Sequence, residues 1–99
     1  MVFILHAHFT ELLANRLAGI YLFGSRARGD ILPDSDMDIL LVLEGDFNPF
    51  DLIEQTSSII ATVSLQYDIV ISLAFISRER FENENTPFML NVRREGVQV

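Results

Sequence analysis

The stretch that decides the fold runs from Gly19 to Leu43 and reads GIYLFGSRARGDILPDSDMDILLVL. It opens with a short apolar run over residues 20–23, which predicts a β-strand, and the step Gly24-Ser25 follows at once. Glycine lets the backbone come close to an anion, and the next residues can open a helix whose free N–H groups point outward. The sequence therefore predicts a phosphate-binding turn at Gly24 and Ser25.

A second predicted strand, residues 36–43, begins with negative charge. Alternate side chains of a strand share a face, so Asp36 and Asp38 project together, roughly 7 Å apart at about 3.3 Å per residue. Two carboxylates on one face repel each other, and a hard divalent cation such as Mg²⁺ between them relieves the repulsion and can bridge to phosphate. The residues after Asp38 are apolar without alternation, which predicts a strand buried on both faces.

These motifs resemble a known pattern. Gly24-Ser25, ten further residues and then Asp36-x-Asp38 resemble the signature of the DNA-polymerase-beta-type nucleotidyltransferase superfamily. The fuller form GSRARGD…PDSDMDILLVL is similar to the minimal nucleotidyltransferases. Members of that group are small partners, often antitoxins, of toxins that carry the higher-eukaryote-and-prokaryote nucleotide-binding (HEPN) domain. The resemblance extends from about Leu17 to the last residue.

The resemblance implies a polymerase-beta-like fold and transfer of AMP from ATP to a hydroxyl, a tyrosine of the HEPN toxin, which silences its ribonuclease. It implies that Asp36 and Asp38 hold two Mg²⁺ ions, while Gly24 and Ser25 hold the β- and γ-phosphates. In that family a third carboxylate begins the strand beside the Asp-x-Asp strand, and Asp68 is the position that fits. The alternative is that Asp68 is a strand-edge charge at a turn.

Length and composition limit the possible functions. Ninety-nine residues make a single domain, 1–99, without room for a second domain that positions an acceptor. The net charge of −7, with every basic residue an arginine, argues against direct nucleic acid binding. The absence of cysteine excludes disulfides and thiolate metal sites. No apolar run approaches the ~18 residues of a membrane span and no signal peptide is recognisable, so we expect a cytoplasmic protein. The 49% apolar content favours a hetero-oligomer with a partner such as the toxin.

The periodicities predict an α/β (α+β) fold, a small mixed sheet flanked by helices. The predicted strands are 20–23, 36–43 and 67–75. The predicted helices are 2–17, 49–65 and 87–95, with a short helix from Ser77 or Arg78. His6 and His8 lie two positions apart on the first helix and therefore on different faces, which disfavours a shared metal site. Arg26 and Arg28 either contact the nucleotide or pair with nearby aspartates.

Two alternatives to protein adenylylation remain open at this stage. The chain could be a binding module that neutralises or scaffolds a helical partner by complex formation, with turnover weak or absent. It could also transfer a nucleotide to a small molecule such as an aminoglycoside. The first alternative is separated from the enzyme by whether the partner gains the mass of a nucleotide.

Overall fold

The computed structural model describes residues 2–23 and 37–99 and confirms the α/β (α+β) fold class. The helices are α1 (Val2–Leu13), the 3₁₀ turn η1 (Ala14–Arg16), α2 (Pro49–Tyr67), α3 (Arg78–Asn83) and α4 (Pro87–Glu95). The strands are β1 (Leu17–Phe23), β2 (Met37–Leu43), β3 (Ile71–Ser77) and β4 (Val97–Gln98). Among these described residues, no helix is both long enough and apolar enough to cross a membrane.

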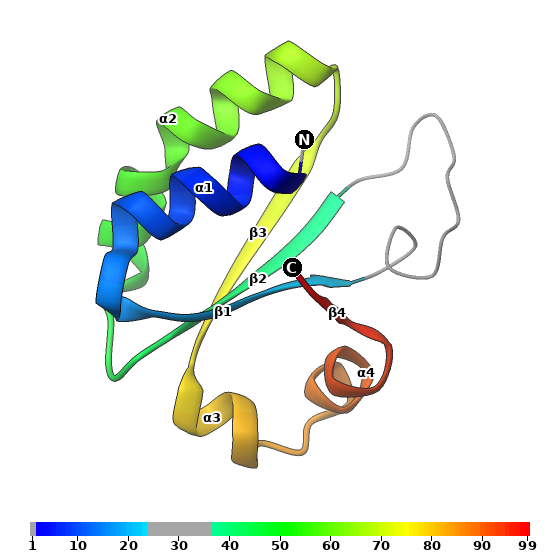
Figure 1. Ribbon diagram of the computed structural model, residues 1–99. Coiled ribbons are helices and arrows are strands. Elements are labelled where there is room, and N and C mark those ends of the chain that lie inside the picture. The colour runs from blue at the N-terminus through cyan, green and yellow to red at the C-terminus, as the bar shows by residue number, and fades with distance from the viewer. Residues whose placement is uncertain (1, 24–36) are drawn as a thin grey trace.

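The strands form one mixed sheet in the order β3-β2-β1-β4 (Figure 1). β1 runs antiparallel to both β2 and β4, whereas β2 and β3 are parallel. A parallel pair needs a crossover, and α2 supplies it between β2 and β3. β2 is the central strand, and six of its seven residues are buried. This confirms the prediction of a strand covered on both faces.

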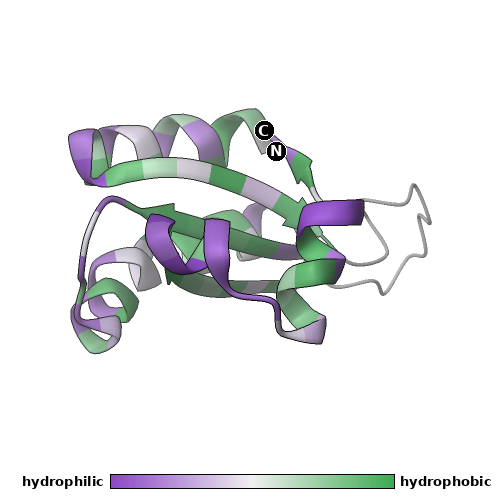
Figure 2. Ribbon diagram, turned by 90° about the horizontal axis from the view of Figure 1, so that it is seen from below, coloured by the Kyte–Doolittle hydropathy of each residue, from purple (hydrophilic) through white to green (hydrophobic). Residues whose placement is uncertain are grey.

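Helices cover both faces of the sheet. α1 and α2 lie on one face, where Phe9, Leu41 and Leu52 belong to the larger core cluster. α3 and α4 lie on the other, where Met89 and Leu40 belong to a second cluster. Hydrophobic residues dominate the strands in Figure 2, whereas the helices alternate between hydrophobic and hydrophilic residues. The sheet is therefore sandwiched between two helical layers, as alternating strand and helix periods predict.

The predicted helix starts are confirmed at two prolines. The Asn48 side chain accepts a hydrogen bond from the Phe50 N–H at 2.9 Å, and Pro49 takes the first helical position of α2. Thr86 caps α4 in the same way. A cap side chain satisfies one of the free N–H groups of the first turn, and proline lacks the N–H that would otherwise be unsatisfied there.

Two predicted boundaries in the first half of the chain were wrong. The helix predicted over 2–17 ends at Leu13, because Ala14 adopts a positive φ of 48° and the chain turns into η1. β1 then begins at Leu17, three residues before the predicted start. Its extra residues pair with the far end of β2, with an irregularity between Leu17 and Gly19.

The strand predicted over 67–75 was also misplaced. α2 continues to Tyr67, where the N–H groups of Asp68 and Ile69 both bond to the Ser64 carbonyl, and β3 starts only at Ile71. Residues 97–99, where the sequence analysis predicted no strand, include β4, and the Val99 N–H donates to the Ile20 carbonyl at 2.9 Å. In both places pairing within the sheet, rather than local periodicity, sets the boundary.

The central position of β2 makes a stability prediction. Leu41 is fully buried in the middle of this strand, so Leu41→Ala should lower the free energy of unfolding by about 2–5 kcal/mol through lost burial and the cavity left behind. Leu65→Ala on α2, where the side chain is 85% exposed, is the matched control and should change it by less than about 0.5 kcal/mol. Urea unfolding followed by circular dichroism measures both, and equal effects would contradict the arrangement of the core.

Candidate functional site

Most residues of the predicted site belong to the segment 24–36, which joins β1 to β2 in the sequence. Gly24, Ser25 and Asp36 lie outside the described residues. The residues that flank the segment are described, and Phe23 at the end of β1 is the cross-strand partner of Asp38 in β2. The chain therefore leaves β1 and enters β2 at one end of the sheet, which we call the loop end (Figure 1).

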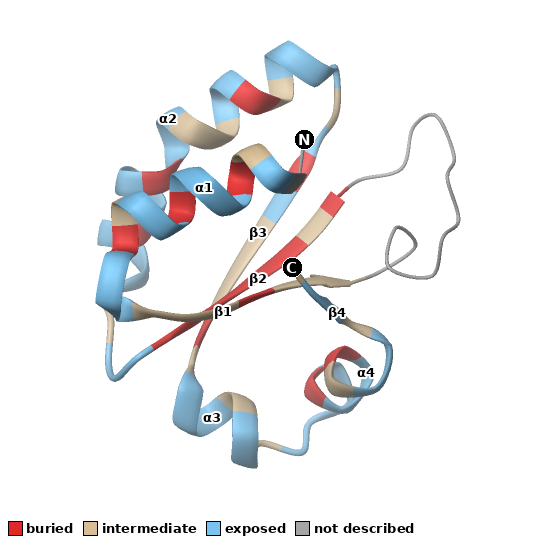
Figure 3. Cartoon of the chain, in the orientation of Figure 1, coloured by how far each residue is buried: buried red, intermediate tan, exposed pale blue. Residues whose placement is uncertain are grey.

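Asp38 lies at the loop end on the face covered by α3 and α4. Strand alternation places its side chain on the same face as Leu40 and Val42, which belong to the second core cluster. Its neighbours in the sheet are Phe23 on β1 and Ser72 on β3. Asp38 is half-buried, whereas the other residues of β2 are buried (Figure 3). The central strand thus presents this carboxylate beside Phe23, the last described residue of β1.

The structure does not place Asp68 at the start of a strand. Asp68 is exposed and ends α2 in the left-handed conformation, with φ 51° and ψ 54°. It precedes Ser72, the residue paired with Asp38, by four positions. Strand pairing therefore does not bring Asp68 beside Asp38. Its location at a turn agrees with the alternative considered from the sequence.

Strand pairing places Ser72, a residue that the sequence did not single out, beside Asp38. The alternation of residues 67–75 puts Asp68 and Ser72 on the same face of a continuous strand, so periodicity alone cannot say which of them reaches the loop end. Only the register does so, and it aligns Ser72 with Asp38.

An aromatic pair borders Asp38 on the side of β1. The rings of Phe23 and Phe88 meet edge to face, with centroids 5.4 Å apart, and Phe88, in the first turn of α4, stays 45% exposed. Edge-to-face packing adds about 0.5–1.5 kcal/mol beyond burial, which helps to hold α4 at this place.

The donor atoms at the loop end suit a hard cation. Asp38 offers carboxylate oxygens and Ser72 offers a hydroxyl, and oxygen ligands are those that Mg²⁺ prefers. The described residues contain no group of three or more His, Cys, Asp and Glu side chains that could hold a metal ion. The described residues alone therefore do not complete a metal site at this end of the sheet.

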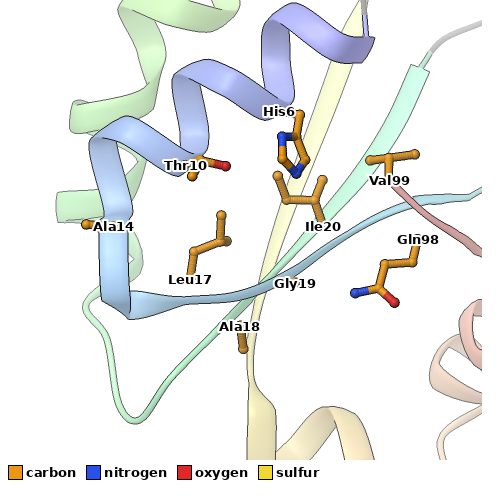
Figure 4. A pocket seen from close by; sticks show the side chains of 9 residues that line it. All are labelled: His6, Thr10, Ala14, Leu17, Ala18, Gly19, Ile20, Gln98 and Val99. Atoms are coloured by element: carbon orange, nitrogen blue, oxygen red, sulfur yellow. The ribbon is translucent and has the colours of Figure 1, made fainter.

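A separate pocket of about 250 Å³ lies between α1, β1 and the last residues of the chain (Figure 4). His6 and Thr10 of α1 and Gln98 of β4 supply its polar side chains, and Leu17, Ile20 and Val99 are the larger apolar ones. Among the residues that the structure describes, no carboxylate side chain lines it. Ile20 belongs to the core under α1 and α2, so this pocket opens on the face of the sheet opposite to Asp38. It is distinct from the predicted site.

Comparison with protein families decides the classification. The model of the nucleotidyltransferase domain family matches residues 7–95. The chain belongs to this family. The match includes the Gly24-Ser25 and Asp36-x-Asp38 motifs as well as β3 and all of α4, so it agrees with the family that the sequence motifs indicated.

Two similar proteins come from Methanocaldococcus jannaschii. The first, named "Putative protein adenylyltransferase MJ0604", is 38% identical over 82 residues, which cover 82% of this nucleotidyltransferase domain and 76% of the relative. The second, "Putative protein adenylyltransferase MJ0141", is 32% identical over 90 residues, covering 91% and 86%. Both comparisons extend over most of each chain.

Solved structures share the fold. A "putative nucleotidyltransferase" from Sulfolobus solfataricus has a TM-score of 0.63 at 26% identity, covering 99% of this chain and 78% of that one. A toxin–antitoxin structure with AMP-PNP has a TM-score of 0.69 at 19% identity, covering 96% and 68%. A mutant of the toxin–antitoxin MntA-HpeT has a TM-score of 0.62 at 19% identity, covering 93% and 69%. At such identities the last two show the fold alone.

The backbone at Asp68 makes a prediction that is independent of catalysis. Because asparagine and glycine tolerate the left-handed region, Asp68→Asn and Asp68→Gly should change the free energy of unfolding by less than about 1 kcal/mol. Asp68→Val should lower it by about 1–2 kcal/mol, since a β-branched residue is strained there. Chemical denaturation of the three variants measures this. Equal stability of the valine and asparagine variants would contradict the helix end at this residue.

Proposed function

We propose that this domain is an antitoxin that transfers AMP from ATP to a hydroxyl, a tyrosine, of a cognate HEPN-domain toxin, and so neutralises the toxin's ribonuclease. The observation that carries the proposal is the 38% identity to a relative named as a protein adenylyltransferase. The fold likeness to toxin–antitoxin structures, one of them with AMP-PNP, supports the choice of partner. Asp38 at the loop end agrees with a nucleotide site there.

The reaction is a displacement at phosphorus. The acceptor oxygen forms a bond to the α-phosphorus of ATP, the bond from that phosphorus to the bridging oxygen breaks, and pyrophosphate leaves with the electron pair while the hydroxyl proton passes to solvent. The protein contributes mainly position and charge. Gly24 and Ser25 would hold the β- and γ-phosphates, and Asp36 and Asp38 would bind divalent metal. Two bound Mg²⁺ ions would neutralise the triphosphate and the developing charge.

A protein acceptor agrees with the architecture. Every described element belongs to one sheet or to the helices that cover it, so the described chain carries no separate acceptor-binding domain. A net charge of −7 disfavours a polynucleotide acceptor. Large apolar side chains stay exposed at Phe3, Phe50 and Leu65, each at least 80% exposed, which leaves apolar surface for a partner.

One observation favours a second candidate, a nucleotide-binding module that neutralises its partner by forming a complex. The residue paired with Asp38 on β3 is a serine and not a carboxylate, so strand pairing places no second acidic side chain directly beside Asp38. A site with fewer carboxylates could bind a metal–nucleotide complex yet turn over slowly. The two candidates differ in whether the partner is modified.

Co-expression with the neighbouring open reading frame tests the transfer. The partner should gain the mass of one AMP group in intact-mass measurement, and replacing its acceptor tyrosine by phenylalanine should abolish the gain. Asp38→Asn should lower the transfer rate by orders of magnitude, because it removes a metal-binding charge with little change of shape. A stable complex with an unmodified partner would reject the transferase and leave the binding module.

Nucleotide binding should depend on divalent metal, because an acidic site repels an uncomplexed triphosphate. Isothermal titration calorimetry with ATP should show binding with Mg²⁺ and a loss of at least tenfold in affinity with excess chelator. Asp38→Asn should bind Mg-ATP more weakly than the parent, with circular dichroism to verify its fold. Equal affinity with and without metal would contradict the assignment of Asp36 and Asp38 as metal ligands.

A further inference from the structure

We propose that the edge of β1 at residues 17–19 is a site for strand addition. Its occupant is an extended, uncharged segment of a partner protein, which continues the line of β4 and places one aliphatic side chain in the pocket under α1 (Figure 4). This surface lies apart from the predicted nucleotide site. The inference therefore goes beyond the proposed function and does not depend on nucleotide transfer.

The pairing of β1 is incomplete on the side of β4. β2 pairs with β1 over almost its whole length, but β4 pairs only with Tyr21 and Leu22. Beyond them, the Val99 N–H donates to the Ile20 carbonyl at 2.9 Å. Among the residues that the structure describes, no strand lies beside residues 17–19 on this side. Such an edge presents backbone N–H and C=O groups to which a further strand can pair.

The pocket follows this edge of β1. Four consecutive residues of the strand, 17–20, line it together with Gln98 of β4 and Val99. Side chains of a strand alternate between its two faces, so consecutive residues line one cavity only where it adjoins the edge of the strand. Figure 4 shows the pocket between α1, β1 and the end of β4. An extended segment that continues the direction of β4 past Val99 therefore enters the pocket.

An interruption in the alternation of β1 creates the pocket. Leu17 and Ile20 pack in the cluster under α1 and α2, whereas Ala18 packs against the cluster under α3 and α4. The irregular pairing between Leu17 and Gly19 accounts for the change of face at Ala18. Gly19, the next residue, has no side chain. Between Leu17 and Ile20, therefore, no side chain of β1 fills the space beside Thr10 of α1.

The register of β4 decides which side chain of the occupant fills this space. Val99 packs against the cluster under α1 and α2, and its N–H bonds to Ile20 of β1. In a continuing strand the next residue lies opposite Gly19 with its side chain on the other face. The residue after it lies opposite Ala18 and points toward α1. Leu17, Ile20 and Val99 surround that position with apolar groups, which favours an aliphatic side chain there.

The size and the charge of the pocket favour a peptide segment over a nucleotide or a cofactor. Its volume of about 250 Å³ is smaller than the roughly 300–1,000 Å³ of sites for drug-sized ligands. Among the described residues that line it, none is an arginine, aspartate or glutamate that would bind a charged group. In strand addition the backbone supplies affinity, and pockets for alternate side chains supply specificity. The edge of β1 and the pocket beside it offer these two contributions together.

A short synthetic peptide tests the edge. Acetyl-Thr-Val-Thr-Val-Thr-amide, titrated into isotope-labelled protein, should shift the backbone amide NMR signals of Ala18 and Gly19 with a Kd of about 0.1–1 mM. Val99 points toward α1 and directs its N–H to β1, so the valines of the peptide should do the same. N-methylation of both valines should therefore abolish the shifts. N-methylation of the central threonine, whose N–H faces away, should leave the Kd within about threefold.

Two variants of α1 test the pocket. Thr10→Phe places a large side chain in it and should weaken peptide binding by at least about tenfold. Ala7→Phe, at an exposed position of the same helix outside the pocket, is the matched control and should leave the Kd unchanged. Circular dichroism verifies that both variants are folded.

A tethered segment removes the dependence on a weak intermolecular affinity. The sequence Thr-Val-Thr added after Val99 should raise the melting temperature by about 4 °C or more, because its valine reaches the pocket at a high effective concentration. The sequence Thr-Asp-Thr is the matched control. It should give no increase, since it would bury a carboxylate among apolar groups.

Failure of the peptide to bind at millimolar concentration, or equal losses on methylating valine and threonine, would overturn the proposal. Equal melting temperatures of the two tethered forms would do the same. Self-association of the protein that Thr10→Phe abolishes would assign the edge to a second copy of the chain and overturn the choice of a partner protein. These readouts need neither ATP nor transfer, so an unmodified toxin would reject the adenylyltransferase without affecting the strand-addition site.

Discussion

The parallel pairing of β2 with β3 is the constraint on which the rest of the molecule depends. It places β2 in the middle of the sheet, where both faces can be covered, and it requires α2 as the crossover on one face. Burial on both faces explains why residues 39–43 are continuously apolar. The same pairing then decides which residue of β3 stands beside the carboxylate at the loop end.

A charged residue is tolerated near the start of β2 because that part of the strand is not fully buried. Asp38 precedes the five buried residues 39–43 of β2 and is itself only half-buried, at the end of the strand where the chain enters the sheet. A carboxylate two positions deeper would replace Leu40 and lose its hydration without a partner, at a cost of several kcal/mol. An acidic side chain on this face of β2 is therefore tolerated only at the loop end.

Much of this could be predicted from the sequence, and the failures have physical causes. The central strand, the Asn48 and Thr86 caps and the nucleotidyltransferase family follow from local patterns that carry their own chemistry. The start of β3 could not be predicted, because the alternation of apolar and polar residues does not show at which residue strand pairing begins. The end of α2 is set by backbone hydrogen bonds to the Ser64 carbonyl. β4 has only two residues, which is too few to show the alternation of a strand. Gly24, Ser25 and Asp36 remain predictions from spacing.

The crossover between β2 and β3 also bears on the order of folding. β1 and β2 are joined directly along the chain, whereas β3 reaches β2 only after residues 44–70 have been ordered around α2. Closing that longer loop costs entropy before the parallel contacts form, so β3 is the strand expected to dock late. β3 is also an edge strand, and its end near Ser72 is exposed. The start of β3 can then separate from β2 at lower cost than β2 can separate from β1, so the parallel pair is the part of the sheet where local unfolding is expected first.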